Sequence, residues 1–352
     1  MRLSFWTAAV AALATVIAGL PAAAAPASGT GPPPVIYDSD LDFDDASTLA
    51  YLCEEHKLGR IDLRAVTVAN NGFGVPDRTL RHARSVLEQC GLPQVPVAAG
   101  ATGEGVNPAP PELVATIEGV LSGALGDGAR PPYISRLSAP ELIARTAQRS
   151  RQPVTLIATG PLTNVAAALA SRATARRIER IQIMGGALRV PGNLYGSALP
   201  GFDNSQEFNF WMDPVSARAV LQRARPGTVR LVPLDATAAV PITQDFVARL
   251  AADQNAPGAR LTYRIVSQPD LAALIDLGIM YWWDALAAVT AVHSSITQFR
   301  PERIDVVQDG VQSGRTVLTP AGYRIEAAAA ADTEAFERCF LDALNGRACS
   351  NQ

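Results

Sequence analysis

The sequence predicts an α/β fold in which one open, mostly parallel sheet carries helices on both faces. Apolar, strand-like runs alternate with helix-like stretches from residue 35 onward, and this alternation is typical of β–α–β units. Polar segments follow the ends of these runs, where open parallel sheets bind their ligands. The length of 352 residues, 48% of them hydrophobic, permits one large domain or two.

The first 34 residues are expected to stand outside the fold. Arg2 precedes an apolar stretch at residues 5–20, and small residues that suit a signal-peptide cleavage site end the segment 1–25. A membrane anchor is the alternative, but the apolar run is short for a span and an Ala/Pro-rich linker follows at 26–34. We therefore expect a bacterial protein that is periplasmic or secreted, with a single folded domain at residues 35–352.

Short apolar runs and helical stretches define the first half of this domain. The predicted strands are residues 35–38, 61–68, 95–98, 154–158 and 178–184. The predicted helices are residues 45–56, 77–90, 139–149 and 162–172, the second of them amphipathic. Residues 100–135 are rich in Gly and Pro without a clean period, which predicts a long surface loop or lid.

The second half continues the alternation. A Gly/Pro/Asn-rich loop at 185–204 precedes a helix at 213–223, which has Pro214 in its first turn. The other predicted elements are strands at 229–233, 304–307 and 315–318, a helix at 283–293 and a C-terminal helix. Together these elements predict a Rossmann-like sheet.

The four cysteines, an even number, agree with an oxidising compartment. Three pairings are open, and the simplest joins Cys53 to Cys90 and Cys339 to Cys349. None of the four lies in a Cys-x-x-Cys motif, which disfavours zinc binding and redox chemistry.

Five aspartates lie within eight residues after the first predicted strand: Asp38, Asp40, Asp42, Asp44 and Asp45. Such a cluster cannot be buried without a compensating cation, and carboxylates between a strand end and a helix start are typical of a site for a hard cation. An exposed acidic turn with an aspartate helix cap is the alternative. An EF-hand does not fit, because Phe43 and Leu49 stand where its loop needs Gly and Glu.

Six blocks, in the same order, resemble the inosine–uridine-preferring nucleoside hydrolase family and span about residues 35 to 295. The first is the aspartate cluster, Asp-Ser-Asp-(three residues)-Asp-Asp. The others lie at residues 66–71, 155–165, 183–214, 232–237 and 283–284. The resemblance implies a fold of the nucleoside hydrolase type and hydrolysis of the N-glycosidic bond of ribonucleosides to free base and ribose.

The resemblance also implies one Ca²⁺, held by Asp40, Asp45, the Thr159 backbone carbonyl and Asp284. Calcium prefers carboxylate and carbonyl oxygens, and no His or Cys lies near these segments to favour a softer metal. By the same resemblance, Asp40 is the general base that activates a metal-bound water. Asp38 would hold Asp40 or the start of the next helix, or alternatively cap the loop.

Further residues match those that surround the sugar in the family. Asp44 and Asn209 would bind ribose hydroxyls, Asn71 would help to place water and sugar, and Asn193 and Glu207 would bind the 5′ hydroxyl. Met184 would lie near the sugar, although methionine is more often a core residue. The remaining polar residues of these blocks are expected to be structural: Asn70, Thr163, Asn164, Asp213 and Asp235.

Two departures from the family pattern matter. The common Pro-Gly of the first block is Leu41-Asp42 here, and we expect the extra acid Asp42 to face solvent. Trp283 replaces a histidine that many members carry before the last metal-binding aspartate. Protonation of the departing base by histidine is therefore not expected.

Trp283 favours a purine substrate, because a purine-preferring branch of the family also has Trp there and an indole face stacks on a purine. Trp282, Tyr281 or the lid residue Tyr133 could join this stacking. The alternative is that Trp283 only packs at the edge of the pocket.

Two other functions stay open from sequence alone. A non-catalytic periplasmic protein could bind ribosides or calcium in such a pocket, although Asp40 and Asp284 are both retained. A haloacid-dehalogenase-like phosphatase also has Asp-x-Asp after a strand, but Asp42 stands where that class has Thr or Val. The net charge of −3 disfavours nucleic-acid binding, no membrane contact is expected after signal cleavage, and the resemblance implies a homo-oligomer, a dimer or tetramer.

Overall fold

The structure, a computed structural model, describes residues 31–102, 107–126, 135–194 and 203–349. The expected signal peptide, most of the linker and the lid residue Tyr133 lie outside the described residues. Gly31–Gln352 form one compact unit. No helix in the described ranges is long and apolar enough to cross a membrane.

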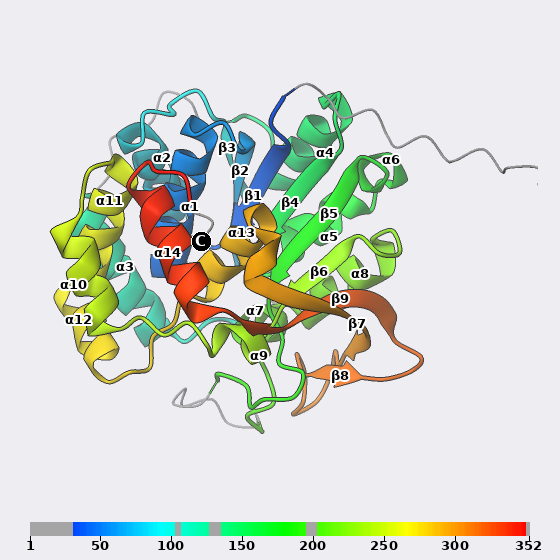
Figure 1. Ribbon diagram of the computed structural model, residues 1–352. Helices are drawn as coiled ribbons and strands as arrows, with labels where there is room; N and C mark the ends of the chain where they lie inside the picture. The colour runs from blue at the N-terminus through cyan, green and yellow to red at the C-terminus, as the bar shows by residue number, and fades with distance from the viewer. Residues whose placement is uncertain (1–30, 103–106, 127–134, 195–202, 350–352) are drawn as a thin grey trace, which may run out of the picture. The chain divides into compact units, whose positions relative to one another are not determined.

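The described strands form one nine-stranded sheet in the order β3-β2-β1-β4-β5-β6-β9-β7-β8 (Figure 1). Neighbouring strands from β3 to β9 are parallel, and β7 is antiparallel to both β9 and β8. This confirms the predicted open, mostly parallel sheet. The strands are β1 Pro34–Ser39, β2 Asp62–Asn70, β3 Val97–Thr102, β4 Val154–Ala158, β5 Ile178–Met184, β6 Val229–Val232, β7 Thr297–Val306, β8 Thr316–Leu318 and β9 Tyr323–Ala331.

Helices lie on both faces of the sheet (Figure 1). One side carries α1 Phe43–Lys57, α2 Arg78–Gln89, α3 Pro111–Leu125, α10 Gln244–Ala252, α11 Pro257–Val266, α12 Pro269–Asp276, α13 Trp283–Val292 and α14 Thr333–Leu344. The other carries α4 Ala139–Arg149, α5 Thr163–Leu169, α6 Arg172–Ala175 and α8 Pro214–Arg223. Each face has its own buried apolar cluster, because alternate residues of β1 point to opposite sides: Val35 and Tyr37 to one, Ile36 to the other.

The prediction of a loop or lid at residues 100–135 is wrong for the central part of this range, because residues 111–125 form the helix α3. Val120, Leu121 and Ala124 of this helix are buried, and α3 packs against α2 and α11. Gly119 and Gly123 lower its intrinsic helix propensity. Packing of one apolar face therefore forms this helix where the sequence pattern did not show it.

The C-terminal third contains elements that the sequence did not predict. Helices α10 to α12 were missed, and β7 begins at Thr297 rather than at residue 304. Strand β9 was also missed, because its alanine-rich run is typical of a helix. Pairing with β6 and β7 on its two sides overrides that propensity.

One of the two predicted disulfides is confirmed, since Cys339 and Cys349 are bonded. The other is wrong in this structure, where Cys53 and Cys90 are buried free thiols. Burial, followed by the neighbouring Cys90, raises the pKa of the Cys53 thiol well above its ordinary value. The guessed pair is thus adjacent but not covalently linked.

Candidate active site

The acidic segment lies where the strand order of the sheet reverses. β1 and β4 are adjacent and parallel, and the sheet extends through β2 on one side and β5 on the other. The backbone N–H of Thr159 donates a hydrogen bond of 2.9 Å to the Asp38 carbonyl, which joins the two strand ends. Open parallel sheets bind ligands at this reversal point, so the segment 40–45 lies at the expected edge.

Asp45 is held by hydroxyl groups from two neighbouring strands. Its Oδ1 accepts hydrogen bonds from the hydroxyls of Tyr37 and Thr159, both at 2.6 Å. Its Oδ2 accepts the Asp42 N–H at 3.3 Å, as part of a capping box at the start of α1. These contacts fix the Asp45 carboxylate without supplying a positive charge.

Asp42, Asp45 and Asp284 bring carboxylate oxygens within 4.8 Å of one another. Asp284 comes from the first turn of α13, so residues distant in sequence meet here. The prediction that Asp42 faces solvent is wrong, because the residue is half-buried. Its Oδ1 caps α1 by accepting the N–H groups of Asp44 and Asp45, each at 3.1 Å, and this cap holds the side chain at the cluster.

Asp40 is enclosed by backbone. Its Oδ2 accepts the Phe73 N–H at 2.6 Å. A Cβ atom at Gly72 would lie 2.0 Å from Oδ2, and one at Gly160 would lie 2.6 Å from Oδ1. Both positions therefore require glycine for this close approach. The Asp40 carboxylate also contacts that of Asp45, which places it beside the three-carboxylate group.

Asp38 is buried and contacts β2 and α5. Its Oδ1 accepts hydrogen bonds from the Thr67 hydroxyl and from the Asn164 amide, the latter at 2.9 Å. Burial raises the pKa of Asp38 to about 7. These side-chain bonds thus join Asp38 to Thr67 and Asn164 rather than to Asp40 or the start of α1. Asn164, which was expected to be structural, holds Asp38.

Asp44 ties α1 to α13 and leaves one oxygen unused. Its Oδ2 accepts the Asp284 N–H at 2.9 Å. Its Oδ1 is buried without a hydrogen-bond partner among the described residues. Burial, followed by the charge of Asp42, raises the pKa of Asp44 well above its ordinary value. A buried carboxylate oxygen without a donor is unfavourable unless a cation binds it.

Among the described residues, no basic side chain balances the charge of this cluster. In the described ranges no Lys, Arg or His forms an ion pair with any of its aspartates. Burial, followed by neighbouring carboxylates, raises the pKa of Asp40 and Asp284 well above the ordinary value and that of Asp45 to about 7. An all-oxygen donor set with an unused buried oxygen fits a hard divalent cation.

Residues matched to the sugar site form a network that reaches Thr159. The Asn209 amide donates to the Thr159 carbonyl at 3.0 Å and lies 3.3 Å from the sulfur of Met184. Glu207 caps α7 (Phe208–Met212) by accepting the N–H groups of Asn209 and Phe210. Met184 is buried, at 2% exposure, so it packs under this network.

Two further asparagines are fixed by neighbouring loops. Asn193 accepts the Phe208 N–H at 3.1 Å. Asn71 donates to the Thr163 hydroxyl at 2.8 Å, and Thr163 donates to Asp213. Thr163, which was expected to be structural, therefore connects the loop after β2 with the start of α8.

Trp283 borders the carboxylates in an aromatic group. Its ring centroid lies 6.3 Å from that of Phe43 and 5.5 Å from that of Tyr281. Phe43 directly precedes Asp44 in the sequence, and Trp283 directly precedes Asp284. Trp283 is partly buried, and the group lies beside the cluster on two different elements.

Trp282 does not belong to this aromatic group. It is fully buried and packs against Phe246 and Phe340, so the expectation that it stacks on a base is wrong. The histidines contact other parts of the chain: His56 accepts the Leu63 N–H, His82 contacts Glu118 and His293 contacts Glu55.

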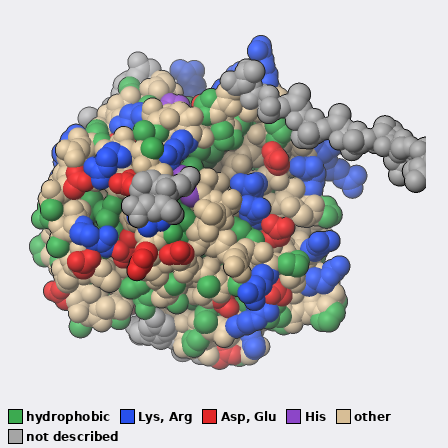
Figure 2. Space-filling view, viewed as in Figure 1, with side chains coloured by type: hydrophobic (Ala, Val, Ile, Leu, Met, Phe, Trp, Pro, Cys, Tyr) green, Lys and Arg blue, Asp and Glu red, His purple; other side chains and the backbone are tan. Residues whose placement is uncertain are grey.

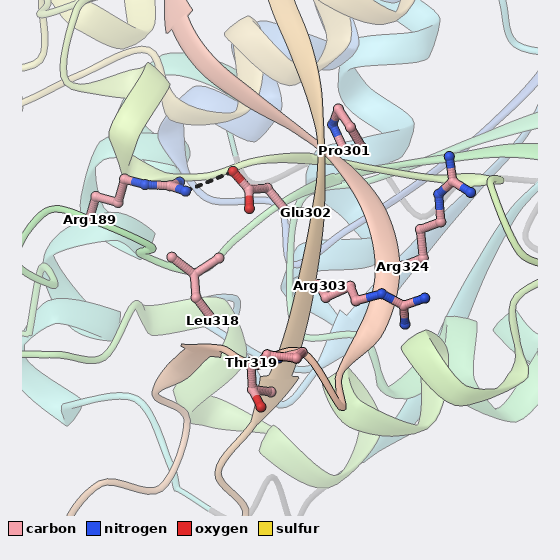
Figure 3. A pocket seen from close by; sticks show the side chains of 8 residues that line it. Arg189, Pro301, Glu302, Arg303, Leu318, Thr319 and Arg324 are labelled. Carbon is pink, nitrogen blue, oxygen red and sulfur yellow. Dashed lines mark hydrogen bonds and ion pairs between the residues drawn. The ribbon is translucent and has the colours of Figure 1, made fainter.

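Acidic and basic side chains lie interspersed on the face shown in Figure 2. An open groove of ≈ 540 Å³ is lined by Arg189, Arg303 and Arg324 together with Glu302, which pairs with Arg189 at 2.8 Å (Figure 3). The residues that line it do not include any of the cluster aspartates. It is therefore a surface feature separate from the candidate site.

Some residues that build the site were not predicted. Tyr37 and Thr67 lie inside strands, where the sequence pattern marks them as core and gives no signal for a polar role. Gly72 and Gly160 each directly follow a polar residue at a strand end. That position could have indicated a close approach of backbone to a functional side chain.

Comparison with known proteins gives a consistent result. The family described as "Inosine-uridine preferring nucleoside hydrolase" matches residues 35–338. The chain is 36% identical to the pyrimidine-specific ribonucleoside hydrolase RihA of Shewanella oneidensis over 71% of each protein. It is also 36% identical to RihA of Citrobacter koseri over 63% of this chain and 66% of that protein. The chain thus spans about two thirds of the length of these relatives.

Solved structures show the same fold. The inosine-uridine preferring nucleoside hydrolase from Bacillus anthracis superposes with a TM-score of 0.76 at 22% identity, covering 89% of this chain and 99% of that one. The purine-preferring ribonucleoside hydrolase from Gardnerella vaginalis gives a TM-score of 0.72 at 22% identity, covering 89% and 98%.

Proposed function

From the premise that this chain belongs to the inosine-uridine preferring nucleoside hydrolase family, we propose that it hydrolyses the N-glycosidic bond of ribonucleosides to free base and ribose, with Ca²⁺ as cofactor. The observation that carries the proposal is the meeting of unpaired carboxylates from the β1–α1 segment and from α13 at the ligand-binding edge of the sheet. A structural role alone does not explain buried charges that lack a partner.

The donors that would hold the ion are Asp40, Asp45, Asp284 and the Thr159 carbonyl. When bound, a divalent cation supplies positive charge that lowers the pKa of a coordinated water and favours binding of the ribose diol. Thr159 is suited to this role because its carbonyl lies at the end of β4 and its hydroxyl orients Asp45. Such second contacts hold ligands in place before the ion arrives.

Asp40 is proposed as the general base that removes a proton from the attacking water. Its carboxylate is fixed between Gly72 and Gly160 and by the Phe73 N–H. A base confined in this way loses little freedom when the water is in place. The neighbouring carboxylates then stabilise the positive charge that develops on the sugar as the bond to the base breaks.

Asp44, Asn71, Asn193, Glu207 and Asn209 are proposed to hold the sugar hydroxyls. Their side chains are already fixed by neighbouring backbone or side-chain groups. A site built to bind a hydroxyl leaves polar groups unpaired when that hydroxyl is missing. Ribonucleosides should therefore be cleaved much faster than 2′-deoxyribonucleosides.

We also propose a preference for purine bases. Trp283, with Tyr281 and Phe43 beside it, gives an aromatic surface next to the carboxylates, and a purine offers more area for stacking than a pyrimidine. The two RihA relatives are named pyrimidine-specific, so this preference would distinguish the chain from them. Comparing kcat/KM for inosine and uridine tests it, and a higher value for uridine would contradict it.

A substrate panel tests the main proposal. The purified protein is incubated with inosine, guanosine, uridine, cytidine and 2′-deoxyinosine, with Ca²⁺ or with excess chelator, and free base and reducing sugar are measured. We expect both products from ribonucleosides with Ca²⁺ and their loss with chelator. Nucleoside binding without products would instead indicate a non-catalytic riboside-binding protein. Phosphate release from phosphate esters would indicate a phosphatase.

Export is proposed on the sequence of residues 1–25. Expression of the full chain in a bacterium, fractionation and sequencing of the N-terminus test it. We expect the mature protein in the periplasm or medium, beginning near residue 26. A cytoplasmic protein with an intact N-terminus would contradict export.

A further inference from the structure

We propose that Asp42 is an additional carboxylate ligand for the divalent cation of this site. The inference rests on the proposed function, because it concerns the same ion. The family pattern has Gly where this chain has Asp42, so the resemblance gives the residue no role. In this structure its carboxylate lies within 4.8 Å of those of Asp45 and Asp284, which places it among the expected ligands.

The turn that carries Asp42 has an unusual backbone conformation. Leu41 has a φ of 53°, in the left-handed region, and its side chain is 0% exposed. Proline, which the family commonly has at this position, is restricted to a φ near −65° and cannot adopt this conformation. Burial of Leu41 holds the unusual backbone in place. The two substitutions together thus build a turn that directs Asp42 toward the start of α1.

The helix cap leaves Asp42 able to bind an ion. Both capping bonds, from the N–H groups of Asp44 and Asp45, go to Oδ1. Oδ2 takes no part in the cap. A carboxylate held through one oxygen is oriented before the ion binds, so it loses little side-chain freedom on binding.

The unused oxygen of Asp44 supports the same conclusion independently. Asp44 is 0% exposed, and its Oδ1 has no hydrogen-bond partner among the described residues. No basic side chain in the described ranges pairs with Asp42 or with Asp44. A positive ion at the cluster relieves both conditions. Calcium affinity rises with the number of charged ligands, so Asp42 should strengthen binding.

The test is calcium affinity measured by isothermal titration calorimetry on the purified protein and on Asp42→Asn. Asparagine caps a helix as well as aspartate does, so this change removes the charge and keeps the cap. Asp332→Asn is the matched control, because Asp332 caps α14 in the same way and is exposed. We expect Kd for Ca²⁺ to rise at least about tenfold in Asp42→Asn and to stay within about twofold in the control.

A Kd for Asp42→Asn within about twofold of the unmodified protein would overturn the inference, as would absence of calcium binding to the unmodified protein. Nucleoside cleavage is a separate readout. Normal cleavage with an unchanged Kd in the variant overturns only the role of Asp42. Calcium binding that weakens in the variant, without cleavage by either protein, supports that role and contradicts the proposed hydrolysis. Melting temperatures in chelator check folding, and we expect Asp42→Asn to be at least as stable.

Discussion

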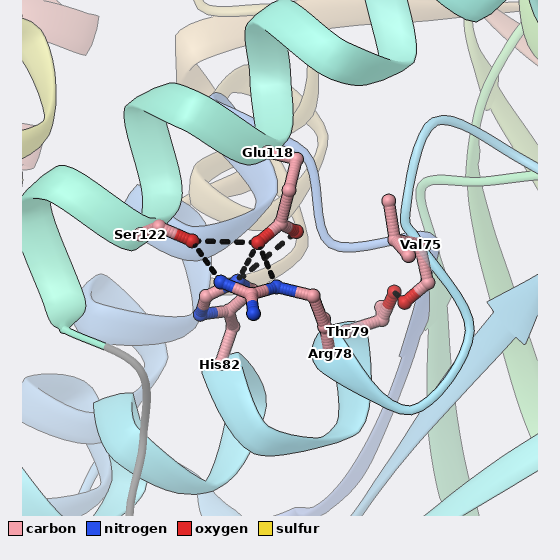
Figure 4. A network of polar contacts seen from close by, with 6 residues as sticks. All are labelled: Val75, Arg78, Thr79, His82, Glu118 and Ser122. Carbon is pink, nitrogen blue, oxygen red and sulfur yellow. Dashed lines mark hydrogen bonds and ion pairs between the residues drawn. The ribbon is translucent and has the colours of Figure 1, made fainter.

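Two groups of carboxylates in this molecule have opposite surroundings. Glu118 of α3 accepts hydrogen bonds from Ser122 at 2.6 Å and from Arg78, and lies 3.2 Å from the His82 ring nitrogen (Figure 4). Although burial opposes the effect, these bonds and the charge of His82 hold the pKa of Glu118 below its ordinary value. The aspartates that follow β1 have no such partners, and their nearest charged neighbours among the described residues are other carboxylates.

The difference separates a carboxylate that stabilises the fold from carboxylates that lower its stability. Glu118 joins α2 to α3 through partners that the chain itself provides. The aspartate cluster has raised pKa values because burial and mutual repulsion disfavour its charge. Proteins keep such unfavourable groups where function needs them. The contrast therefore supports the proposed cation at the cluster, and it gives the Glu118 network a structural role.

Among the variants that test this contrast, we expect Asp40→Asn to cause the largest loss of activity. Loss of a general base lowers kcat by about 10³-fold, while removal of one of several repelling charges should raise the melting temperature of the chelator-treated protein. Base release and thermal unfolding measure the two effects. A variant with near-normal kcat would remove the assignment of Asp40 as the base.

Glu118→Gln is the control from the other group. It keeps the shape of the side chain but weakens the bonds to Arg78 and His82. We expect a loss of stability of about 1–2 kcal/mol with kcat unchanged. A large loss of activity in this variant would mean that the network between α2 and α3 is coupled to the site, and the division into two groups would not hold.

A smaller loss of activity is expected from Gly72→Ala, since the new Cβ would lie 2.0 Å from the Asp40 carboxylate. Displacement of a catalytic group by about 1 Å can lower the rate about 10²-fold. Gly119→Ala in α3 is the matched control, because nothing lies within 4 Å of its Cβ. It should leave the rate unchanged and stabilise the helix by about 0.5–1 kcal/mol. Equal rates for both variants would show that Asp40 tolerates displacement.

The sequence alone predicted those parts of the site that are marked by a local sequence pattern. The alternation of strands and helices predicted the sheet. The polar segment after β1 predicted Asp40, Asp44 and Asp45 as site residues, because short polar segments after apolar runs can be recognised without the fold. It failed for Asp42, whose direction depends on the left-handed turn at Leu41. It also failed for Tyr37, whose hydroxyl donates to Asp45 and accepts a hydrogen bond from Thr159, the residue just after β4. Side-chain direction in a turn and contacts across strands depend on tertiary structure.

The same limit explains the errors elsewhere in the fold. α3 contains two glycines and β9 an alanine-rich run, so local propensity points away from the structure that each adopts. Both are formed by packing against elements distant in sequence. The site lies where local pattern and tertiary structure agree at the strand ends, and this is why more of it could be predicted than of the C-terminal third.

The pH dependence of stability should have opposite signs for the two groups. Asp38 and Asp45 have pKa values raised from 3.8 to about 7, so the folded chain binds more protons than the unfolded chain between these values. Stability of the cation-free protein should therefore fall as pH rises through this window. The lowered pKa of Glu118 acts in the other direction, because its contribution is lost as pH falls below the ordinary value of 4.5.

Melting temperatures measured with chelator at about pH 5 and about pH 7 should therefore fall by several degrees as pH rises. Saturating Ca²⁺ should remove most of this fall, because a cation that binds the ionised carboxylates stabilises the folded state more at the higher pH. Melting temperatures that rise equally with pH in chelator and in Ca²⁺ would contradict the view that the cluster lowers stability without an ion.

The four cysteines also fall into two pairs with different surroundings. Neither pair is part of the proposed site, so this last prediction concerns their oxidation state and not activity. Cys339 and Cys349 form a disulfide, whereas Cys53 and Cys90 are buried thiols. Burial raises the pKa of Cys53, and a thiol that stays protonated and shielded from solvent oxidises slowly. Alkylation after unfolding without reductant should therefore label two cysteines per chain, measured by mass. Labelling of none would show that the buried pair also closes, and that burial does not protect these adjacent thiols in an oxidising compartment.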